Sequence, residues 1–155
     1  MEKNLTPAVA TTITRLTSHV LEMPGKCRDL PAEEWLHKPL PGKWSKQEIL
    51  GHLVDSAINN LKRFTETQIL PQPYTVIGYK QVELVQLNQY QQLPLDHIVQ
   101  LWLALNQQIL YVITNIPADK LSCTVIIPSG ESKTLGWLID DYADHFEHHW
   151  KQIFS

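Results

Sequence analysis

The sequence predicts an all-α protein that folds as one four-helix bundle. Four segments place apolar residues at alternating spacings of three and four, the period of an amphipathic helix. Ten prolines, most of them grouped between these segments, separate one helix from the next. No segment shows a strong strand pattern, and 155 residues suit a single domain spanning 1–155. Amphipathic helices that bury their apolar faces against one another form a bundle.

The first helix is expected from Thr6 to about Glu22. Its apolar stripe consists of Val9, Ile13, Leu16, Val20 and Leu21. Met23-Pro24-Gly25 predicts its end, because proline and glycine interrupt helices. The linker that follows is long for a compact domain, so we expect a short helical turn between Pro31 and Leu36.

The second helix has the clearest beginning. Ser45-Lys46-Gln47-Glu48 forms a capping box, in which the Ser45 hydroxyl accepts the Glu48 amide and the Glu48 side chain reaches back. This pattern explains Glu48 as a helix cap rather than as a catalytic acid. The helix should continue to Ile69, before Pro71. Its core stripe consists of Ile49, Leu53, Ala57, Leu61 and Phe64.

The remaining segments alternate helices with long connections. A short polar helix is expected within Tyr79–Tyr90, and a long helix from Pro94, which suits a first helical turn, to about Asn115. The β-branched run 123–127, followed by turn residues 128–131, predicts a small β-hairpin before the last helix. That helix should span Thr134 to Phe154. Such long connections do not suit a simple up-and-down bundle with tight turns.

Composition and charge exclude several classes of function. The formal net charge is -3, the pI is about 6.1, and the basic residues form no run. Binding to nucleic acid or to a membrane surface is therefore not expected. No apolar stretch approaches the roughly 18 residues of a membrane helix, and no signal-peptide pattern is present. Cys27 and Cys123 lie far apart and outside any CxxC motif, which predicts free thiols and a cytoplasmic location.

Three of the seven histidines lie within residues 144–149. His145 and His149 are four residues apart, so on a helix they share a face, which here lies within the apolar stripe. His148 points about 100° away from His149 around the helix axis and is not expected to join them. Spacing alone therefore makes His145 and His149 a plausible metal-binding pair. By the same reasoning His52, which borders the core stripe of the second helix, is an ordinary core histidine.

Other catalytic motifs are absent from the sequence. It contains no HExxH motif, no paired ExxH motifs, no GxSxG motif and no glycine-rich phosphate loop. A phosphotransfer histidine is not expected, because His52 borders the core stripe. The acidic cluster Asp140, Asp141 and Asp144 on the last helix is interpreted as a solvated face or as acids around the site.

Two motifs resemble the DinB/YfiT-like superfamily. The first is residues 41–56, PGKWSKQEILGHLVDS, with Asn59-Asn60 and Arg63-Phe64 after it. The second is residues 145–153, HFEHHWKQI. Together with the length and the helix order, the resemblance covers essentially the whole chain. It implies a four-helix bundle with a long crossover connection and a divalent metal bound by His52, His145 and His149.

The resemblance also implies classes of reaction and partner. Members of the family include metal-dependent thiol S-transferases, a thiol-dependent isomerase and proteins assigned as metal-dependent hydrolases. They are often dimers, so we expect a homodimer that takes a small-molecule substrate, such as a low-molecular-weight thiol. Trp150-Lys151 stands where many relatives carry Arg-Gly. This departure lies outside the metal ligands and concerns the substrate and the partner.

Three neutral imidazoles with one open position describe a catalytic metal site. Zn²⁺ or Ni²⁺ suits nitrogen ligands. The open position can hold a water or a thiol, so hydrolysis and thiol transfer both remain possible. The alternative is a non-enzymatic metal-binding bundle of the stress response.

The histidine rings of a metal site need hydrogen-bond partners for their second nitrogens. Asp55 and Asn59 follow His52 by one and two helical turns, and Tyr142 precedes His145 by one turn. These three are the candidates for residues around the ligands. The alternative for Asp55 is a surface ion pair with Arg63.

Overall fold

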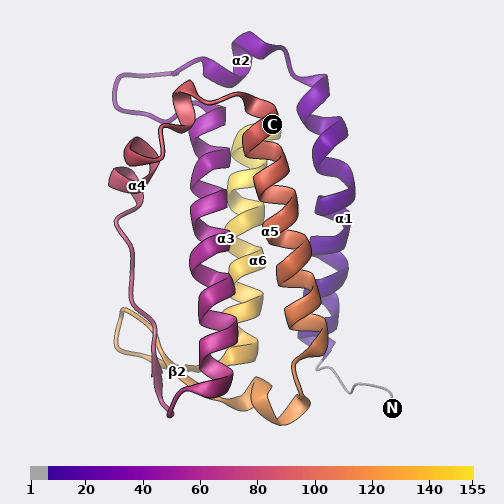
Figure 1. Ribbon diagram of the computed structural model, residues 1–155, viewed down its shortest axis with the longest axis vertical. Coiled ribbons are helices and arrows are strands. Elements are labelled where there is room, and N and C mark those ends of the chain that lie inside the picture. Colours follow the sequence, from indigo (N-terminus) through magenta and orange to yellow (C-terminus); the bar gives the residue numbers. More distant parts are fainter. Residues whose placement is uncertain (1–6) are drawn as a thin grey trace.

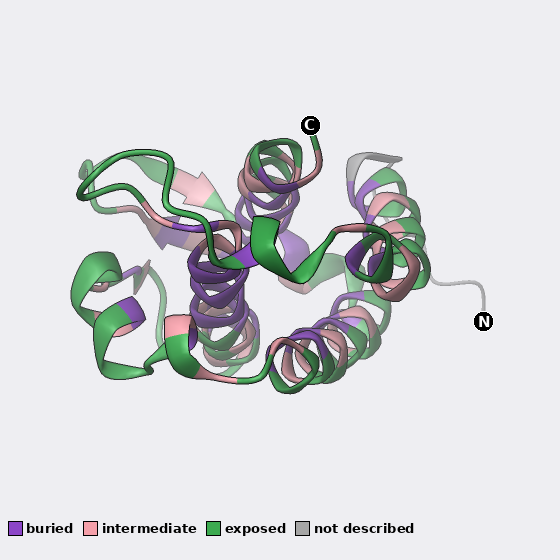
Figure 2. Cartoon of the chain, turned by 90° about the horizontal axis from the view of Figure 1, so that it is seen from above, coloured by how far each residue is buried: buried purple, intermediate pink, exposed green. Residues whose placement is uncertain are grey.

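Four long helices form the body of the computed structural model, which describes residues 7–155 (Figure 1). They are α1 (Pro7–Asp29), α3 (Lys46–Ile69), α5 (Leu95–Asn115) and α6 (Leu135–Phe154). Both α1 and α3 pack against α5 and α6, so α1 and α3 lie diagonally opposite each other (Figure 2). The fold is the four-helix bundle that the sequence predicts. Thr6, the expected first residue of α1, lies outside the described residues.

The connection between α3 and α5 is the long crossover of the bundle. The two helices run in the same direction, so residues 70–94 return along the outside of the bundle (Figure 1). This segment contains β1 (Tyr74–Thr75), α4 (Gln81–Leu87) and the 3-10 turn η1 (Tyr90–Gln92). Val85 and Tyr90 are buried where α4 and η1 pack against α3. The expected short helix is confirmed as α4.

The predicted end of α1 was wrong, because the helix continues through Pro24 and Gly25 to Asp29. A proline inside a helix costs about 3 kcal/mol, since it removes a backbone donor and crowds the preceding turn. The extension buries Met23 and Cys27, which carry the apolar stripe of α1 further along the core. Burying an apolar side chain of the size of Met23 stabilises by about 1.5–3 kcal/mol. Tertiary packing therefore offsets the local preference to end the helix.

The start of α3 confirms the capping box. The Glu48 amide donates to Ser45 Oγ at 3.1 Å, and the Ser45 amide donates to Glu48 Oε1 at 3.1 Å. Lys38 Nζ lies 2.9 Å from the same Glu48 oxygen. Glu48 thus acts as the cap that the sequence predicts. The expected helical turn before it is α2 (Ala32–Leu36), which buries Trp35.

A small sheet closes one end of the bundle, after the 3-10 turn η2 (Ala118–Ser122) (Figure 1). The expected hairpin is confirmed, since β2 (Thr124–Ile126) pairs with β3 (Ser132–Thr134) in antiparallel register. β1 pairs with β2 in parallel, with Tyr74 opposite Val125. The sequence did not predict β1, because a two-residue strand among prolines shows no strand period. This pairing anchors the beginning of the crossover to the base of α6.

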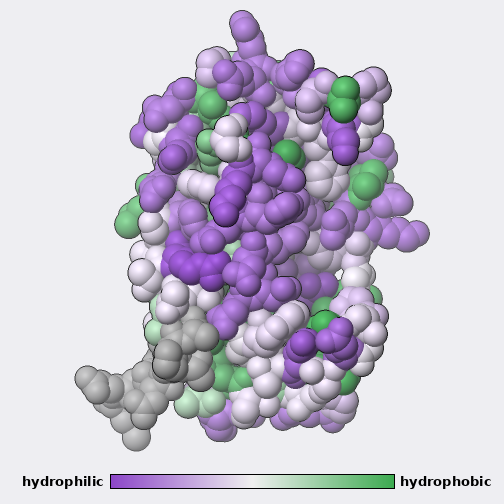
Figure 3. All heavy atoms as spheres, turned by 180° about the vertical axis from the view of Figure 1, so that it is seen from behind, coloured by the Kyte–Doolittle hydropathy of each residue, from purple (hydrophilic) through white to green (hydrophobic). Residues whose placement is uncertain are grey.

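The core is rich in aromatic rings. Trp102 of α5 stacks on Phe146 of α6 with their centroids 5.2 Å apart, and Phe64 of α3 meets Tyr142 edge-on at 5.8 Å. Buried residues line the inner faces of the helices (Figure 2), whereas the outer face seen in Figure 3 is mainly hydrophilic. Within the described residues, no helix is long and apolar enough to cross a membrane.

Candidate metal centre

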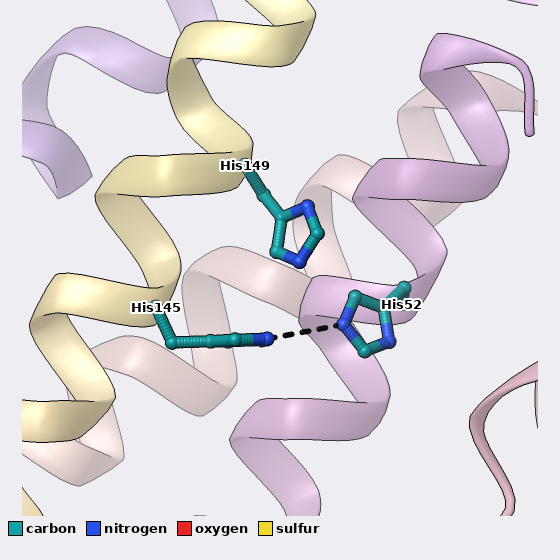
Figure 4. Close-up of side chains that lie close together, drawn as sticks. All are labelled: His52, His145 and His149. Carbon is teal, nitrogen blue, oxygen red and sulfur yellow. Dashed lines mark hydrogen bonds between the residues drawn. The ribbon is translucent and has the colours of Figure 1, made fainter.

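Three histidine rings converge between α3 and α6 (Figure 4). His52 projects from α3, and His145 and His149 project from successive turns of α6. The ring centroids lie 5.2 Å apart for His52 and His145, 4.8 Å for His52 and His149, and 4.7 Å for His145 and His149. The packing of α3 against α6 therefore joins His52 to the pair that helical spacing predicts.

One pair of ring nitrogens has the spacing of two ligands in a tetrahedral metal site, and the third ring is close to both. Nε2 of His52 and Nε2 of His145 lie 3.3 Å apart, and one nitrogen of each ring lies within 4.8 Å of the other two. Two nitrogens at about 2.0–2.1 Å from one ion, at the tetrahedral angle, are roughly 3.4 Å apart. Among the described residues, no cysteine or acid completes the group as a fourth ligand. The three rings fit a divalent ion with a position left open.

Burial keeps these rings neutral, which is the state that a metal ligand needs. Desolvation is the main cause, and repulsion between the rings adds to it. Together they lower the pKa of His52 to about 3 and that of His145 to about 4. Desolvation also lowers the pKa of His149. His52 is completely buried, so its Nε2 faces the other two rings rather than water.

Gln152 determines which nitrogen of His149 faces the cluster. His149 Nδ1 lies 2.7 Å from Gln152 Oε1, and an amide oxygen can only accept. The ring therefore donates its Nδ1–H to Gln152 and keeps the Nε2 lone pair free. The Trp44 ring packs 5.0 Å from the His52 ring, and His52 Nδ1 is buried without a hydrogen-bond partner. Sequence reasoning missed both neighbours, although the three-residue spacing of His149 and Gln152 was a usable signal.

The residues predicted to surround the ligands form their hydrogen bonds elsewhere. Tyr142 donates to Asn106 Oδ1 at 2.5 Å, inside the core. Asn59 donates to the backbone oxygen of Asp55 at 2.8 Å. Helical spacing placed these side chains close to the histidines, but none of their hydrogen bonds reaches one of the three rings.

Asp55 is buried and belongs to the crossover contact. Its Oδ1 accepts the Tyr90 hydroxyl at 2.6 Å and the Asn88 amide at 3.0 Å, while Oδ2 is buried without a partner. Burial is the main cause of its raised pKa, and the two donors oppose the rise. The alternative ion pair of Asp55 with Arg63 is not formed, because Arg63 donates to Asn60 and Ile77.

His148 and the acidic cluster stand outside the three-histidine group. His148 is exposed, and it is not one of the residues that converge. Two of the acids pair with α1, since Thr12 donates to Asp140 at 2.6 Å and Arg15 lies 2.8 Å from Asp144. Asp141 instead faces a cleft beside His145.

Comparison with known proteins identifies the family. The sequence profile of the DinB superfamily matches residues 14–153, nearly the full length. The chain belongs to the DinB superfamily. No curated protein matches it at a significant level.

A solved structure of the DinB type has the same fold. YfiT from Bacillus subtilis, described as a probable metal-dependent hydrolase with an unusual four-helix bundle topology, superposes with a TM-score of 0.85. The match covers 99% of this chain and 87% of YfiT, at 16% sequence identity. The likeness confirms the bundle and the crossover connection expected for the DinB superfamily.

Two clefts reach the histidines of this DinB-superfamily protein. The first cleft, about 280 Å³, touches His145 and lies between α3, α6 and residues 76–81 of the crossover. The second cleft, about 550 Å³, touches His149 and is walled by Trp44 and Ile49. Each cleft therefore exposes one ring of the cluster, His145 in the first and His149 in the second.

Proposed function

We propose that this protein is a metal-dependent enzyme that activates a nucleophile at an ion held by His52, His145 and His149. The observation that carries the proposal is the convergence of three neutral imidazoles, with no fourth protein ligand among the described residues, beside open clefts. The reaction is hydrolysis if the nucleophile is water and S-transfer if it is a thiol.

The bound ion would supply Lewis-acid activation of the nucleophile, and Zn²⁺ and Ni²⁺ both suit three nitrogen ligands. The protein itself would orient the ligands, shield them from solvent and admit the substrate. Gln152 holds the His149 ring in the tautomer that presents Nε2, and Trp44 shields His52 from solvent. The two clefts give a small-molecule substrate access to the open side of the site. The shared fold with YfiT, described as a probable metal-dependent hydrolase, supports the same class of chemistry.

Metal analysis of the purified protein tests the site. We expect about one equivalent of a divalent ion per chain in the wild type and a large loss in His52→Ala and His149→Ala. His148→Ala is the matched control, because it removes an exposed neighbour on the same helix. Unchanged metal content in the first two variants would contradict the assignment.

Turnover assays on the metal-loaded and chelator-treated protein separate the two reactions. One arm offers low-molecular-weight thiols with 1-chloro-2,4-dinitrobenzene, and the other offers activated esters without a thiol. Metal-dependent turnover only with a thiol identifies an S-transferase, and turnover without a thiol identifies a hydrolase. If metal is bound but neither arm shows turnover, the protein is the non-enzymatic metal-binding bundle instead.

The two cysteines form no disulfide, which is compatible with a reducing cytoplasm. The family likeness also supports a homodimer, which is the first inference to test. Light scattering behind a sizing column checks the first inference. A mass of about twice 17.8 kDa is the expected result.

A further inference from the structure

The first cleft extends from His145 along α3 and carries a row of polar side chains on one side. Ser56, Asn60 and Arg63 follow His52 at intervals of four, four and three residues, so all four side chains lie on one face of the helix. The cleft is lined by Ser56, Asn60 and Arg63 on this side and by Asp141 and His145 on α6. Arg63 and the candidate metal ligand His145 therefore line the same cleft.

The Arg63 side chain is held in place, but only some of its N–H donors form hydrogen bonds. It donates to the Ile77 backbone oxygen at 2.7 Å and to Asn60 Oδ1 at 3.5 Å, and its guanidinium lies over the Tyr79 ring, 5.6 Å from the centroid. A guanidinium has five N–H donors, so several are left to face the cleft. These contacts orient the side chain before any ligand arrives.

Arg63 has no carboxylate partner among the described residues. No ion pair within 4.0 Å involves its guanidinium, which is only partly exposed. Asp141 lines the same cleft and attracts the Arg63 guanidinium electrostatically, but the two do not form an ion pair within 4.0 Å. The position that a carboxylate would normally take beside a half-buried arginine is therefore open to a ligand.

Helix geometry gives the length of that ligand. The rise of about 1.5 Å per residue places the Arg63 backbone about 16 Å along α3 from His52. Arg63 lines the cleft together with His145, whose ring meets the His52 ring. The hydrogen bond to Asn60 brings the guanidinium back toward the histidines. The reactive atom and the anionic group of a bound molecule should therefore be separated by less than this offset of about 16 Å.

We propose that Arg63 recognises a carboxylate or similar anionic group of the substrate, while the reactive end of the same molecule lies at the three histidines. This assignment rests on the proposed metal site. It names the substrate class as a small anionic molecule, and Arg63 as the residue that selects it. Bidentate pairing with an arginine fork gives both affinity and orientation.

A pair of thiols that differ only in charge tests the proposal on cobalt-loaded protein. 6-Mercaptohexanoate and 6-mercaptohexan-1-ol have chains of equal length, and binding of either thiolate to Co²⁺ produces a charge-transfer absorption band. A hydrogen-bonded charge pair supports a preference of about 10-fold or more for the carboxylate. We expect this preference in the wild type and its loss in Arg63→Gln, which removes the charge and keeps a polar side chain. Arg63→Lys should retain part of it, because lysine keeps the charge but not the fork.

Lys62→Gln is the matched control, since Lys62 is an exposed cation of the same helix that lines neither cleft, and its loss should leave the preference unchanged. Equal affinity for the two thiols in the wild type would overturn the proposal, as would a preference that survives in Arg63→Gln. If Arg63→Gln proves unfolded by circular dichroism, full retention of the preference in Arg63→Lys overturns the bidentate contact. Failure of the wild type to take up Co²⁺ has a different signature, the absence of any cobalt spectrum, and rejects the metal site itself.

Discussion

Nε2 of His52 on α3 and Nε2 of His145 on α6 lie 3.3 Å apart, although the two residues are separated by 93 positions in the sequence. At this distance one neutral ring donates its proton to the other when no ion is bound. An ion in the cluster replaces that single hydrogen bond with a ligand bond to each ring. The metal-free protein therefore holds neutral histidines close together, and several measurable properties follow.

The stability of the metal-free protein should fall as the pH is lowered from 7 to 5. The pKa of His52 is lowered to about 3 and that of His145 to about 4 in the folded state, from an ordinary value near 6.5. Below pH 6.5 the unfolded chain binds protons at these rings and the folded protein does not. Stability present above pH 6.5 is therefore lost progressively until the pH reaches the folded pKa values.

Urea denaturation at several pH values measures this effect. His52→Asn should have a smaller pH dependence, because one of the three rings with a lowered pKa is gone. His97→Ala, which removes an exposed histidine of α5, should behave as the wild type does. A wild-type midpoint that is the same at pH 7 and pH 5 would contradict the burial of neutral rings.

Gln152→Ala should weaken metal binding without unfolding the protein. The substitution removes the acceptor of the His149 Nδ1–H, and loss of such a partner typically lowers metal affinity about 10–100-fold. Competition with a chromophoric chelator measures the change. Gln107→Ala, an exposed glutamine on α5, is the control and should have wild-type affinity. Equal affinity in Gln152→Ala and the control would show that Gln152 does not orient the ring.

Gly51→Ala should destabilise the fold by forcing the crossover away from α3. A Cβ atom at residue 51 would lie 2.2 Å from the Tyr90 ring, so the ring must shift, and its hydroxyl then leaves Asp55. Overpacking of this kind costs about 1–3 kcal/mol. Thermal unfolding measures the loss. In Gly136→Ala the nearest atom would be 3.5 Å away, so this control should unfold at the wild-type temperature or above it.

Tyr142→Phe should reduce stability and leave the metal content unchanged. The Tyr142 hydroxyl donates to Asn106 Oδ1, which is buried, and the variant leaves that oxygen unpaired. An unpaired buried acceptor costs about 1–3 kcal/mol. Denaturant titration and metal analysis of the same sample give both readouts, with Tyr111→Phe, 69% exposed, as the control. If Tyr142→Phe loses metal and Tyr111→Phe does not, the Tyr142 hydroxyl supports the metal ligands after all.

Most helices and the hairpin could be predicted because their signals are local. The Ser45–Glu48 capping box starts α3 as predicted, and the run before the turn at 128–131 forms β2. The prediction failed at Pro24, where the local cost of a proline is offset by burial of Met23 and Cys27. That burial depends on α5 and α6, which pack against α1 but are distant in sequence.

The sequence by itself determined that His145 and His149 share a face, because a four-residue spacing on a helix has only one geometry. The sequence also contains the two motifs that resemble the DinB/YfiT-like superfamily, and this resemblance implied His52 as the third ligand. Only the tertiary structure decided that the His52 ring meets the other two, that Gln152 holds His149, and that Asp55 turns to Tyr90 rather than to the site. The reason is physical. Helical periodicity says which side chains are neighbours along one helix, but the partner across the interface depends on how separate helices pack.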